Sequence, residues 1–272
     1  MTGDVEFDRI APVYDETRRP PSAEEVRALV EMLGGCPTVL DAGVGTGRFA
    51  IPSQAHGFRV FGVDLSFGMM RLARAKGLSH LVRADLCHLP FTDRSVDAAF
   101  MAHVLQLIPE PREALAELGR VARRRVVVQL PEWFERPPSE AWRERRNRYR
   151  EIAAELGYSL PERGKRYWHS IEELSEIATP RDVRVVLRPP PAGPATDERY
   201  SRWASEMIGG GRIPPEVHEE IVRRLRKEFP QDLAAFARPR RTRFVLWDAS
   251  QLVPKTEKLS GLPSSRRPGG GA

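Results

Sequence analysis

Three aspartates in the first third of the chain stand at the ends of short apolar runs that have the pattern of β-strands. They are Asp41 in "VLDAG", Asp64 in "FGVD" and Asp85 in "VRAD", about one strand–helix unit apart. Because the carboxyl ends of parallel strands lie along one edge of a sheet, we expect these carboxylates to lie near one another. Carboxylates accept hydrogen bonds from hydroxyl and amino groups and favour a ligand that carries positive charge.

A glycine-rich loop directly follows the first of these acids. In "DAGVGTGRF" glycine occupies positions 43, 45 and 47. Glycine has no Cβ and adopts positive φ readily, so such a backbone can turn tightly and lie against a ligand. A predicted helix over residues 47–56 would add its N-terminal amides to the same place. This arrangement is typical of a nucleotide site.

The spacing of the loop argues against a dinucleotide and so against an NAD-dependent oxidoreductase. Pyrophosphate-binding loops follow GxGxxG, and here the last position of that pattern is Arg48. Asp41 lies two residues before the first glycine, where it would repel a diphosphate. Asp64, 17 residues after Gly47, stands where a carboxylate binds a ribose diol. With Asp85 as a third acid, the pattern favours a cationic ligand that contains a ribose.

Apolar segments with strand patterns alternate with helical patterns along most of the chain. The predicted strands cover residues 38–42, 59–64, 80–85, 96–102, 125–130, 183–188 and 241–248, and the predicted helices cover 47–56, 67–76, 111–122, 139–156, 170–178, 197–208 and 214–229. This alternation predicts an α/β fold in which helices cover both faces of a seven-stranded, mostly parallel sheet. About fifty residues separate the last two strands, which predicts a helical cap inserted around them.

The ordered set of motifs resembles the class I S-adenosylmethionine-dependent methyltransferases. "VLDAGVGTGRF" is similar to the first motif of that family, "GVDLSFGMMRLAR" to the second, and "RADLCHLPFTDRSVDAAFMAHVLQLIPEP" to the third and fourth. The opening "FDRIAPVYDETR" resembles the branch of quinone-biosynthesis and other small-molecule enzymes, the methyltransferase type 11 domains. The resemblance implies a Rossmann-like core, S-adenosylmethionine as cofactor, and methyl transfer to an O-, N- or C-nucleophile of a small molecule.

The resemblance also implies a role for each matching residue. Asp64 would bind the ribose hydroxyls, Asp85 would accept the adenine amino group beside the Leu86 amide, and Asp41 would order the loop or receive the cofactor's amino group. Tyr14 and Arg18 would close over the cofactor. The expected cofactor-binding set is Tyr14, Arg18, Asp41, Gly43, Gly45, Gly47, Asp64, Leu65, Met69, Asp85, Leu86, Met101 and His103. Alternatively, Asp64 could cap the helix after "DLS", and Tyr14 and Arg18 could be packing and surface residues.

No catalytic residue is assigned from the sequence. His103 lies near the predicted reaction site and is a candidate proton acceptor, or else a structural residue. Many relatives have a histidine where this chain has Leu107, so no base can be placed there. A base is needed only if the nucleophile arrives protonated. The six histidines show no paired spacing for a metal, and none is predicted.

The patterns divide the chain into five segments. We predict a cofactor-covering helical segment at 1–37, the cofactor-binding core at 38–131, an acceptor-binding cap at 132–240 that contains strand 183–188, a last core strand at 241–250, and a disordered tail at 251–272. The cap holds most of the aromatic residues, which favours an apolar acceptor pocket, although they could form the cap's own core. They are Trp133, Phe134, Trp142, Tyr149, Tyr167, Trp168, Tyr200 and Trp203.

Composition limits the partners. The net charge of +6 comes almost wholly from arginines in scattered clusters that are interleaved with glutamate, which disfavours nucleic-acid binding. Two cysteines and the lack of a long apolar run predict a cytoplasmic protein without a membrane span. The alternatives left open are an RNA or protein methyltransferase and a non-catalytic regulator that binds the same cofactor. The oligomeric state is not predicted.

Overall fold

Seven strands form one sheet in the order β3-β2-β1-β4-β5-β7-β6. They are β1 (Thr38–Ala42), β2 (Arg59–Asp64), β3 (Leu81–Arg83), β4 (Val96–Ala102), β5 (Ala122–Pro131), β6 (Asp182–Arg188) and β7 (Arg240–Asp248). Strand β7 runs antiparallel to both of its neighbours, β5 and β6, and the other adjacent pairs are parallel. This computed structural model describes residues 4–18, 20–131, 140–160, 169–188, 213–229 and 240–253. The predicted fold class is confirmed.

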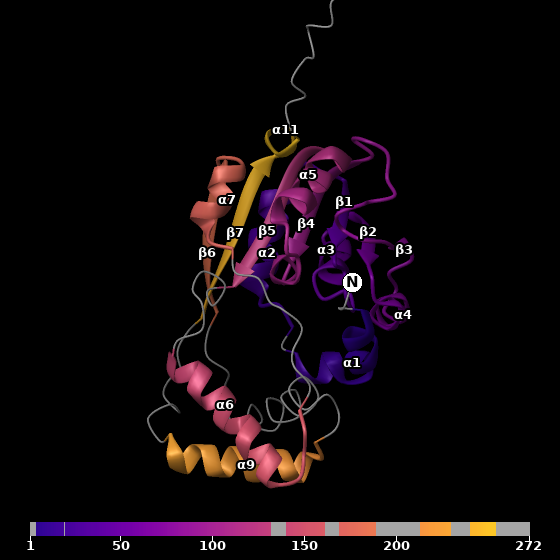
Figure 1. Cartoon of the computed structure of the whole chain (residues 1–272). Helices are drawn as coiled ribbons and strands as arrows, with labels where there is room; N and C mark the ends of the chain where they lie inside the picture. The colour runs from indigo at the N-terminus through magenta and orange to yellow at the C-terminus, as the bar shows by residue number, and fades with distance from the viewer. Residues whose placement is uncertain are drawn as a thin grey trace, which may run out of the picture.

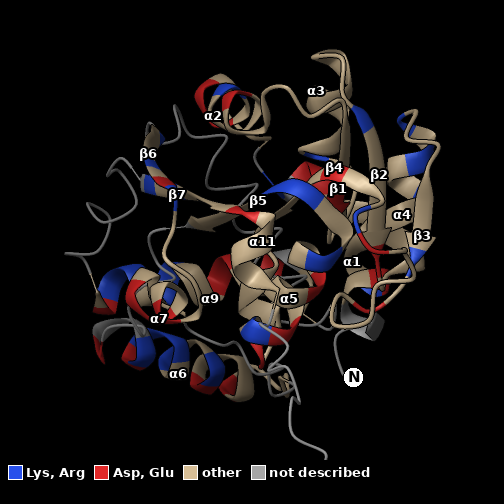
Figure 2. Cartoon of the chain, turned by 90° about the horizontal axis from the view of Figure 1, so that it is seen from above, with Lys and Arg blue, Asp and Glu red and all other residues tan. Residues whose placement is uncertain are grey.

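Helices cover both faces of the sheet (Figures 1 and 2). One face carries α2 (Ala23–Leu33), α3 (Ala50–Ala55) and α4 (Phe67–Ala75), and the other carries α5 (Pro111–Val121), α7 (Ile171–Ile177) and α11 (Ala249–Leu252). Because successive side chains of a strand point to opposite faces, Phe100 and Met101 of β4 are buried in different cores. The sheet is therefore apolar on both faces, as the continuous apolar strands predict.

Three further helices lie beyond the carboxyl ends of the parallel strands. Helix α1 (Asp4–Thr17) packs against α4, while α6 (Glu140–Glu155) and α9 (Pro215–Glu228) form a separate pair below it in Figure 1. This α6–α9 pair has its own small core, which includes Tyr149, Ile152 and Ile221. The predicted helix at 197–208 lies outside the described residues, as do Trp133, Phe134, Tyr167, Trp168, Tyr200 and Trp203.

Several predicted boundaries need correction. The helix predicted from residue 47 begins at Ala50, because residues 47–49 belong to the glycine loop. Strand β3 ends at Arg83, so Asp85 follows the strand instead of closing it. Helix α11 extends to Leu252, so the tail predicted from residue 251 starts too early, and residues 254–272 lie outside the described part of the chain.

The run of three arginines at 123–125 belongs to strand β5, which was predicted to begin only at residue 125. Arg125 donates to the carbonyl oxygens of Met32 and Gly34 at 2.7 and 2.8 Å, and Arg124 donates to that of Gly35. These oxygens lie at the carboxyl end of α2, where cations are favourable. The cluster therefore fastens a helix to the sheet.

Candidate functional site

The glycine loop turns sharply between β1 and α3. Gly43 and Val44 both donate backbone hydrogen bonds to the carbonyl oxygen of Val63, each 2.8 Å long, which fixes the loop to the end of β2. The three glycines have φ of +79°, +54° and +82°, a region that glycine adopts without strain. A Cβ on Gly43 would lie 2.3 Å from Cγ2 of Val104, so only glycine fits there.

The middle of the loop presents bare backbone to open space. A Cβ on Gly45 would meet no atom within 4 Å, whereas one on Gly47 would lie 3.1 Å from Cγ1 of Ile51. The N–H of Gly45 donates to Oδ2 of Asp64 at 2.8 Å. An uncovered backbone beside an oriented carboxylate fits a ligand that lies flat on the loop, such as the ribose and methionine parts of the expected cofactor.

Asp64 is held by backbone amides on both sides. Besides the bond from Gly45, its Oδ1 accepts from the N–H of Ser66 at 2.9 Å. These two bonds fix the orientation of the Asp64 carboxylate beside the glycine loop. The cap of α4 is Ser66, whose Oγ accepts from the N–H of Met69 at 3.1 Å. The alternative role of Asp64 as the cap is therefore wrong.

Asp41 lies beneath the loop and not on its surface. Asp41 is only 2% exposed, and its carboxylate accepts a hydrogen bond from the backbone of Ala50, the first residue of α3. Burial, and then the charge of Asp64, raise the pKa of Asp41 well above its usual range. This supports the loop-ordering role. Burial disfavours the charged form of Asp41, so the expectation that three aspartates each bring a full negative charge to the site is weakened.

Asp85 shapes the turn after β3. Its Oδ1 accepts from the N–H of Cys87 at 2.9 Å, and Leu86 between them is buried in the core. Burial, and then the charge of Asp85, raise the pKa of Cys87 to about 11. The thiol of Cys87 therefore stays protonated near neutral pH and is a poor nucleophile.

Helix α1 is fastened over the loop by two acids that sequence reasoning missed. Oδ1 of Asp8 accepts from Oγ of Ser66 and from the N–H of Gly68, both at 2.6 Å. Oδ1 of Asp15 accepts from Oγ1 of Thr46 at 2.6 Å, and Asp15 also forms an ion pair with Lys76. The available signal was their spacing: acids seven residues apart lie on one face of a helix.

Tyr14 and Arg18 lie at the carboxyl end of α1. The guanidinium of Arg18 lies 5.3 Å from the centre of the Tyr14 ring, within the range of a cation–π interaction. Burial lowers the pKa of Arg18, and the charge of Arg48 lowers it further. Arg18 is therefore partly buried and is not the exposed surface charge that the alternative predicted. Arg48 brings a second positive charge near it.

His103 follows β4 with a φ of +60°, a left-handed conformation that is uncommon for a residue other than glycine. Its carbonyl oxygen accepts from Nε2 of Gln106 at 2.7 Å, which holds this turn. Burial lowers the pKa of the His103 ring well below its usual value, and the charges of Arg48, Arg18 and Arg188 lower it further. The imidazole is therefore neutral at physiological pH and a weak base. Residues held in such conformations cluster at functional sites.

The remaining predicted residues are divided between core and surface. Met101 is fully buried in the sheet core, and Met69 packs with Ile10 and Ala11 where α4 meets α1. Leu65 is 37% exposed at the end of β2. Contact of these three side chains with a cofactor stays a prediction.

The sequence model of the methyltransferase domain family matches residues 40–128 of the chain. A 2-phytyl-1,4-naphtoquinone methyltransferase of Trichormus variabilis is 32% identical over 161 residues, which cover 53% of this chain and 70% of that protein. The chain belongs to the S-adenosylmethionine-dependent methyltransferase family. As in other members of this family, its cofactor is S-adenosylmethionine.

Other family members resemble the chain over a shorter part of their length. A demethylmenaquinone methyltransferase of Renibacterium salmoninarum is 34% identical over 124 residues, 43% of this chain and 52% of that protein. The chain spans about half the length of the first curated relatives that it matches. The structure of a possible histamine N-methyltransferase from Thermotoga maritima has the same fold, with a TM-score of 0.51, 23% identity, and coverage of 70% of this chain and 86% of that one.

No group of three or more histidine, cysteine, aspartate or glutamate side chains in the described segments is arranged to hold a metal ion. None of the helices that the structure describes has both the length and the apolar character needed to cross a bilayer.

Proposed function

We propose that this chain transfers a methyl group from S-adenosylmethionine to a small-molecule acceptor. The observation that carries the proposal is the pairing of open backbone at Gly45 with the Asp64 carboxylate, 2.8 Å from the Gly45 nitrogen. Asp64 would accept the ribose hydroxyls, and the backbone of the glycine loop would lie along the methionine part. Asp85 and the Leu86 amide would bind adenine, and Arg18 would pair with the cofactor's carboxylate.

The chemical work of the protein would be alignment and exclusion of water. When bound, S-adenosylmethionine supplies a methyl group that its sulfonium already activates. Orientation alone can contribute about 7–11 kcal/mol to lowering such a barrier. Helix α1, fastened by Asp8 and Asp15, would cover the cofactor side, and the left-handed turn at His103 would shape the floor. Because His103 is a weak base, we infer that it is not the group that takes a proton from the nucleophile.

We further propose that the acceptor enters from the side of the α6–α9 pair, beyond the carboxyl ends of the strands. The predicted cap at 132–240 would form the acceptor side. Two relatives are named for a demethylmenaquinone and a phytylnaphthoquinone acceptor, which supports a small, largely apolar molecule. A cytoplasmic location suits the two free cysteines, Cys36 and Cys87.

The test is methyl uptake from S-adenosylmethionine labelled in its methyl group. The full chain is incubated separately with small-molecule extract, total RNA and protein from bacterial cells. We expect label in the small-molecule fraction alone. Label in RNA or protein would favour that alternative, and cofactor binding without uptake in any fraction would favour a non-catalytic regulator.

A further inference from the structure

Strand β6 forms an edge of the sheet, at the opposite end from β3 (Figure 2). Its seven residues pair with β7, and no strand of the described chain pairs with its outer edge. An edge strand presents a row of backbone N–H and C=O groups that can pair with a strand of another chain, and proteins often block this with a proline or a bulge. Strand β6 keeps a regular register with β7, and its sequence DVRVVLR contains no proline. It is therefore suited to accept a further strand.

One face of β6 carries an exposed apolar stripe, formed by Val183, Val185 and Leu187. These residues are 40%, 52% and 60% exposed. Val183 pairs in register with Val245, which is buried in the core on the side of α5, α7 and α11. The stripe therefore extends that face of the sheet beyond the helices that cover it. A contiguous apolar patch of this kind is typical of an interaction site.

A second copy of the chain offers the same edge. A two-fold axis perpendicular to the sheet makes two β6 strands antiparallel and keeps their matching faces on the same side. If the axis passes through Val185, all seven residues of the two strands overlap. Val185 then faces its own copy and Val183 faces Leu187, because side chains of one face alternate along each strand. The apolar stripe becomes continuous across the two copies.

The charged residues of β6 favour this register over the two beside it. With the axis at Val185, Asp182 stands opposite Arg188, and Arg184 stands opposite Val186. Moving the axis to Arg184 would place that arginine opposite its own copy, and moving it to Val186 would place Arg184 opposite Arg188. Like charges directly opposite destabilise a strand pair, whereas opposite charges stabilise it. The edge is therefore complementary to itself in the central register.

The contacts that these charged residues make within one copy are compatible with such pairing. Arg184 forms ion pairs with Glu31 and Asp182, and Arg188 forms one with Glu25. A guanidinium has five N–H donors and a carboxylate accepts several hydrogen bonds, so these pairs need not break when Asp182 meets Arg188 of a second copy.

We propose that two copies of the chain pair through β6, with the two-fold axis at Val185, and so form one continuous sheet. The inference does not depend on the proposed function, because β4, β5 and β7 separate β6 from β1 and the glycine loop that follows it. One strand pair makes a small interface, at the low end of the range for specific association. We therefore expect a dimer Kd on the order of 10 μM.

The first measurement is the mass of the full chain in solution. Sedimentation equilibrium over roughly 1–100 μM protein should show mostly monomer at the low end and mostly dimer at the high end. A chain that stays monomeric over this whole range would overturn the inference.

The second measurement tests the position of the axis. Because Val185 is 52% exposed in one copy, a charged side chain there should leave the fold intact. In V185K, and separately in V185E, like charges would meet across the axis, and we expect the dimer to weaken roughly 100-fold. An equal mixture of V185K and V185E should dimerise again, because lysine then stands opposite glutamate. Recovery would also show that both variants are folded, whereas a mixture that stays monomeric would overturn the inference.

Val253→Lys is the matched control. Val253 has the same side chain and is 41% exposed, but it follows α11 instead of standing on β6. V253K should dimerise as the wild type does. A dimer that persists unchanged in V185K, or that is lost equally in V253K, would show that the copies do not pair through β6.

Discussion

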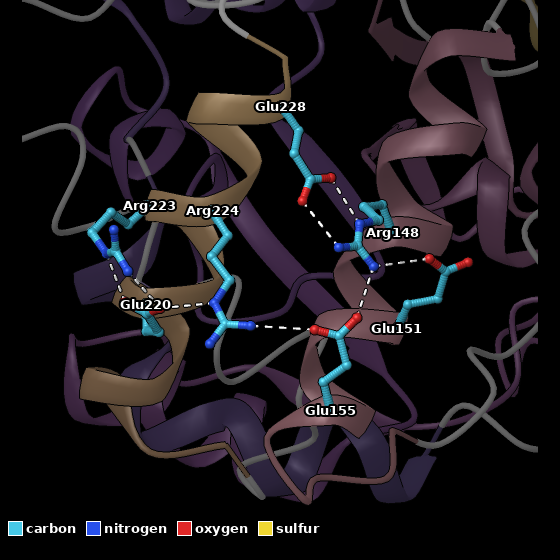
Figure 3. A network of polar contacts seen from close by, with 7 residues as sticks. All are labelled: Arg148, Glu151, Glu155, Glu220, Arg223, Arg224 and Glu228. Atoms are coloured by element: carbon cyan, nitrogen blue, oxygen red, sulfur yellow. Dashed lines mark hydrogen bonds and ion pairs between the residues drawn. The ribbon is translucent and has the colours of Figure 1, made fainter.

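The glycine loop and the α6–α9 pair are organised by different kinds of interaction. In the loop, short hydrogen bonds join backbone amides to carboxylates and carbonyls, as between Gly45 and Asp64 at 2.8 Å. In the α6–α9 pair, charged side chains meet on the surface, as Figure 3 shows. There Arg148 reaches Glu228, Glu151 and Glu155, while Arg224 joins Glu155 to Glu220.

This difference determines what each region reveals in its sequence. A backbone that must turn at positive φ requires glycine at set positions, and a carboxylate that reaches it must stand at the end of the next strand. Such a region carries a recognisable motif. Surface ion pairs can be exchanged for others at little energetic cost, and they leave a pattern of mixed charge that many helices share.

The largest effect should come from breaking the loop at Gly43. In Gly43→Ala the new Cβ would lie 2.3 Å from Cγ2 of Val104, and the residue would keep a φ of +79°. We expect the free energy of unfolding to fall by roughly 4 kcal/mol, from overpacking and backbone strain together. Urea denaturation followed by circular dichroism measures this.

Gly45→Ala is the control for that substitution, because its Cβ would meet no atom within 4 Å. It should lower the free energy of unfolding by only about 1–2 kcal/mol, from its left-handed conformation. Its affinity for S-adenosylhomocysteine should nevertheless fall more than tenfold. Equal stability losses in the two variants would contradict the packing described at Val104.

The next largest effect should come from acidification, which should open the α6–α9 pair and leave the glycine loop intact. His218 is buried in this pair, with Nδ1 2.5 Å from the hydroxyl of Tyr149, and burial lowers the pKa of His218 from 6.5 to about 4. The unfolded chain takes up a proton below pH 6.5, whereas the folded pair does so only near pH 4. Stability is therefore fully present above pH 6.5 and is lost as pH falls toward 4.

The loss should reach about 3 kcal/mol at the acid end of that window. Hydrogen exchange of the amides in residues 140–160 and 213–229 measures it, with the glycine loop as an internal reference. The double variant His218→Leu with Tyr149→Phe removes the titrating group and its partner, so this acid-dependent opening should disappear. Acid-dependent opening that persists in the double variant would show that another group is responsible.

A smaller effect should come from loosening α1. Asp8→Ala removes the acceptor for Ser66 and Gly68 and should cost about 1–2 kcal/mol in the free energy of closing α1 over the loop. We expect S-adenosylhomocysteine to dissociate several-fold faster, as stopped-flow fluorescence can measure. Asp93→Ala, which breaks an ion pair with Arg120, is the control and should leave dissociation unchanged.

The smallest effect should come from Arg148→Ala at the surface of the α6–α9 pair, although Arg148 pairs with three glutamates. Because these side chains are solvated, we expect a slight fall in Tm at low salt that vanishes at about 1 M salt. A large fall that is insensitive to salt would show that the network stabilises the pair far more than exposed ion pairs do.

Most of the sheet could be predicted because its central strands, such as β1 and β4, are buried on both faces and have continuous apolar runs. The predicted strand boundaries were wrong where side-chain contacts with distant residues determine the boundary. The arginines at 123–125 look like a loop, yet they extend β5, and Arg124 and Arg125 bind carbonyl oxygens at the end of α2, about ninety residues away. A local pattern cannot show such a contact.

The residues of the candidate site likewise divide into those that the sequence predicts and those that depend on distant contacts. Asp64 could be predicted because its place at the end of β2 follows from the fold. For Asp8 and Asp15 the spacing indicates only a shared helix face, since their partners Ser66 and Thr46 are fixed only when α1 packs against the loop.

The central claim is that the glycine loop and Asp64 form a site for S-adenosylmethionine. Calorimetric titration of the full chain with S-adenosylhomocysteine, and separately with NAD, tests it most directly. We predict a Kd on the order of 1–10 μM for S-adenosylhomocysteine, at least tenfold weaker binding in Asp64→Ala, and no measurable heat with NAD. Tighter binding of NAD, or an unchanged affinity in Asp64→Ala, would contradict the claim.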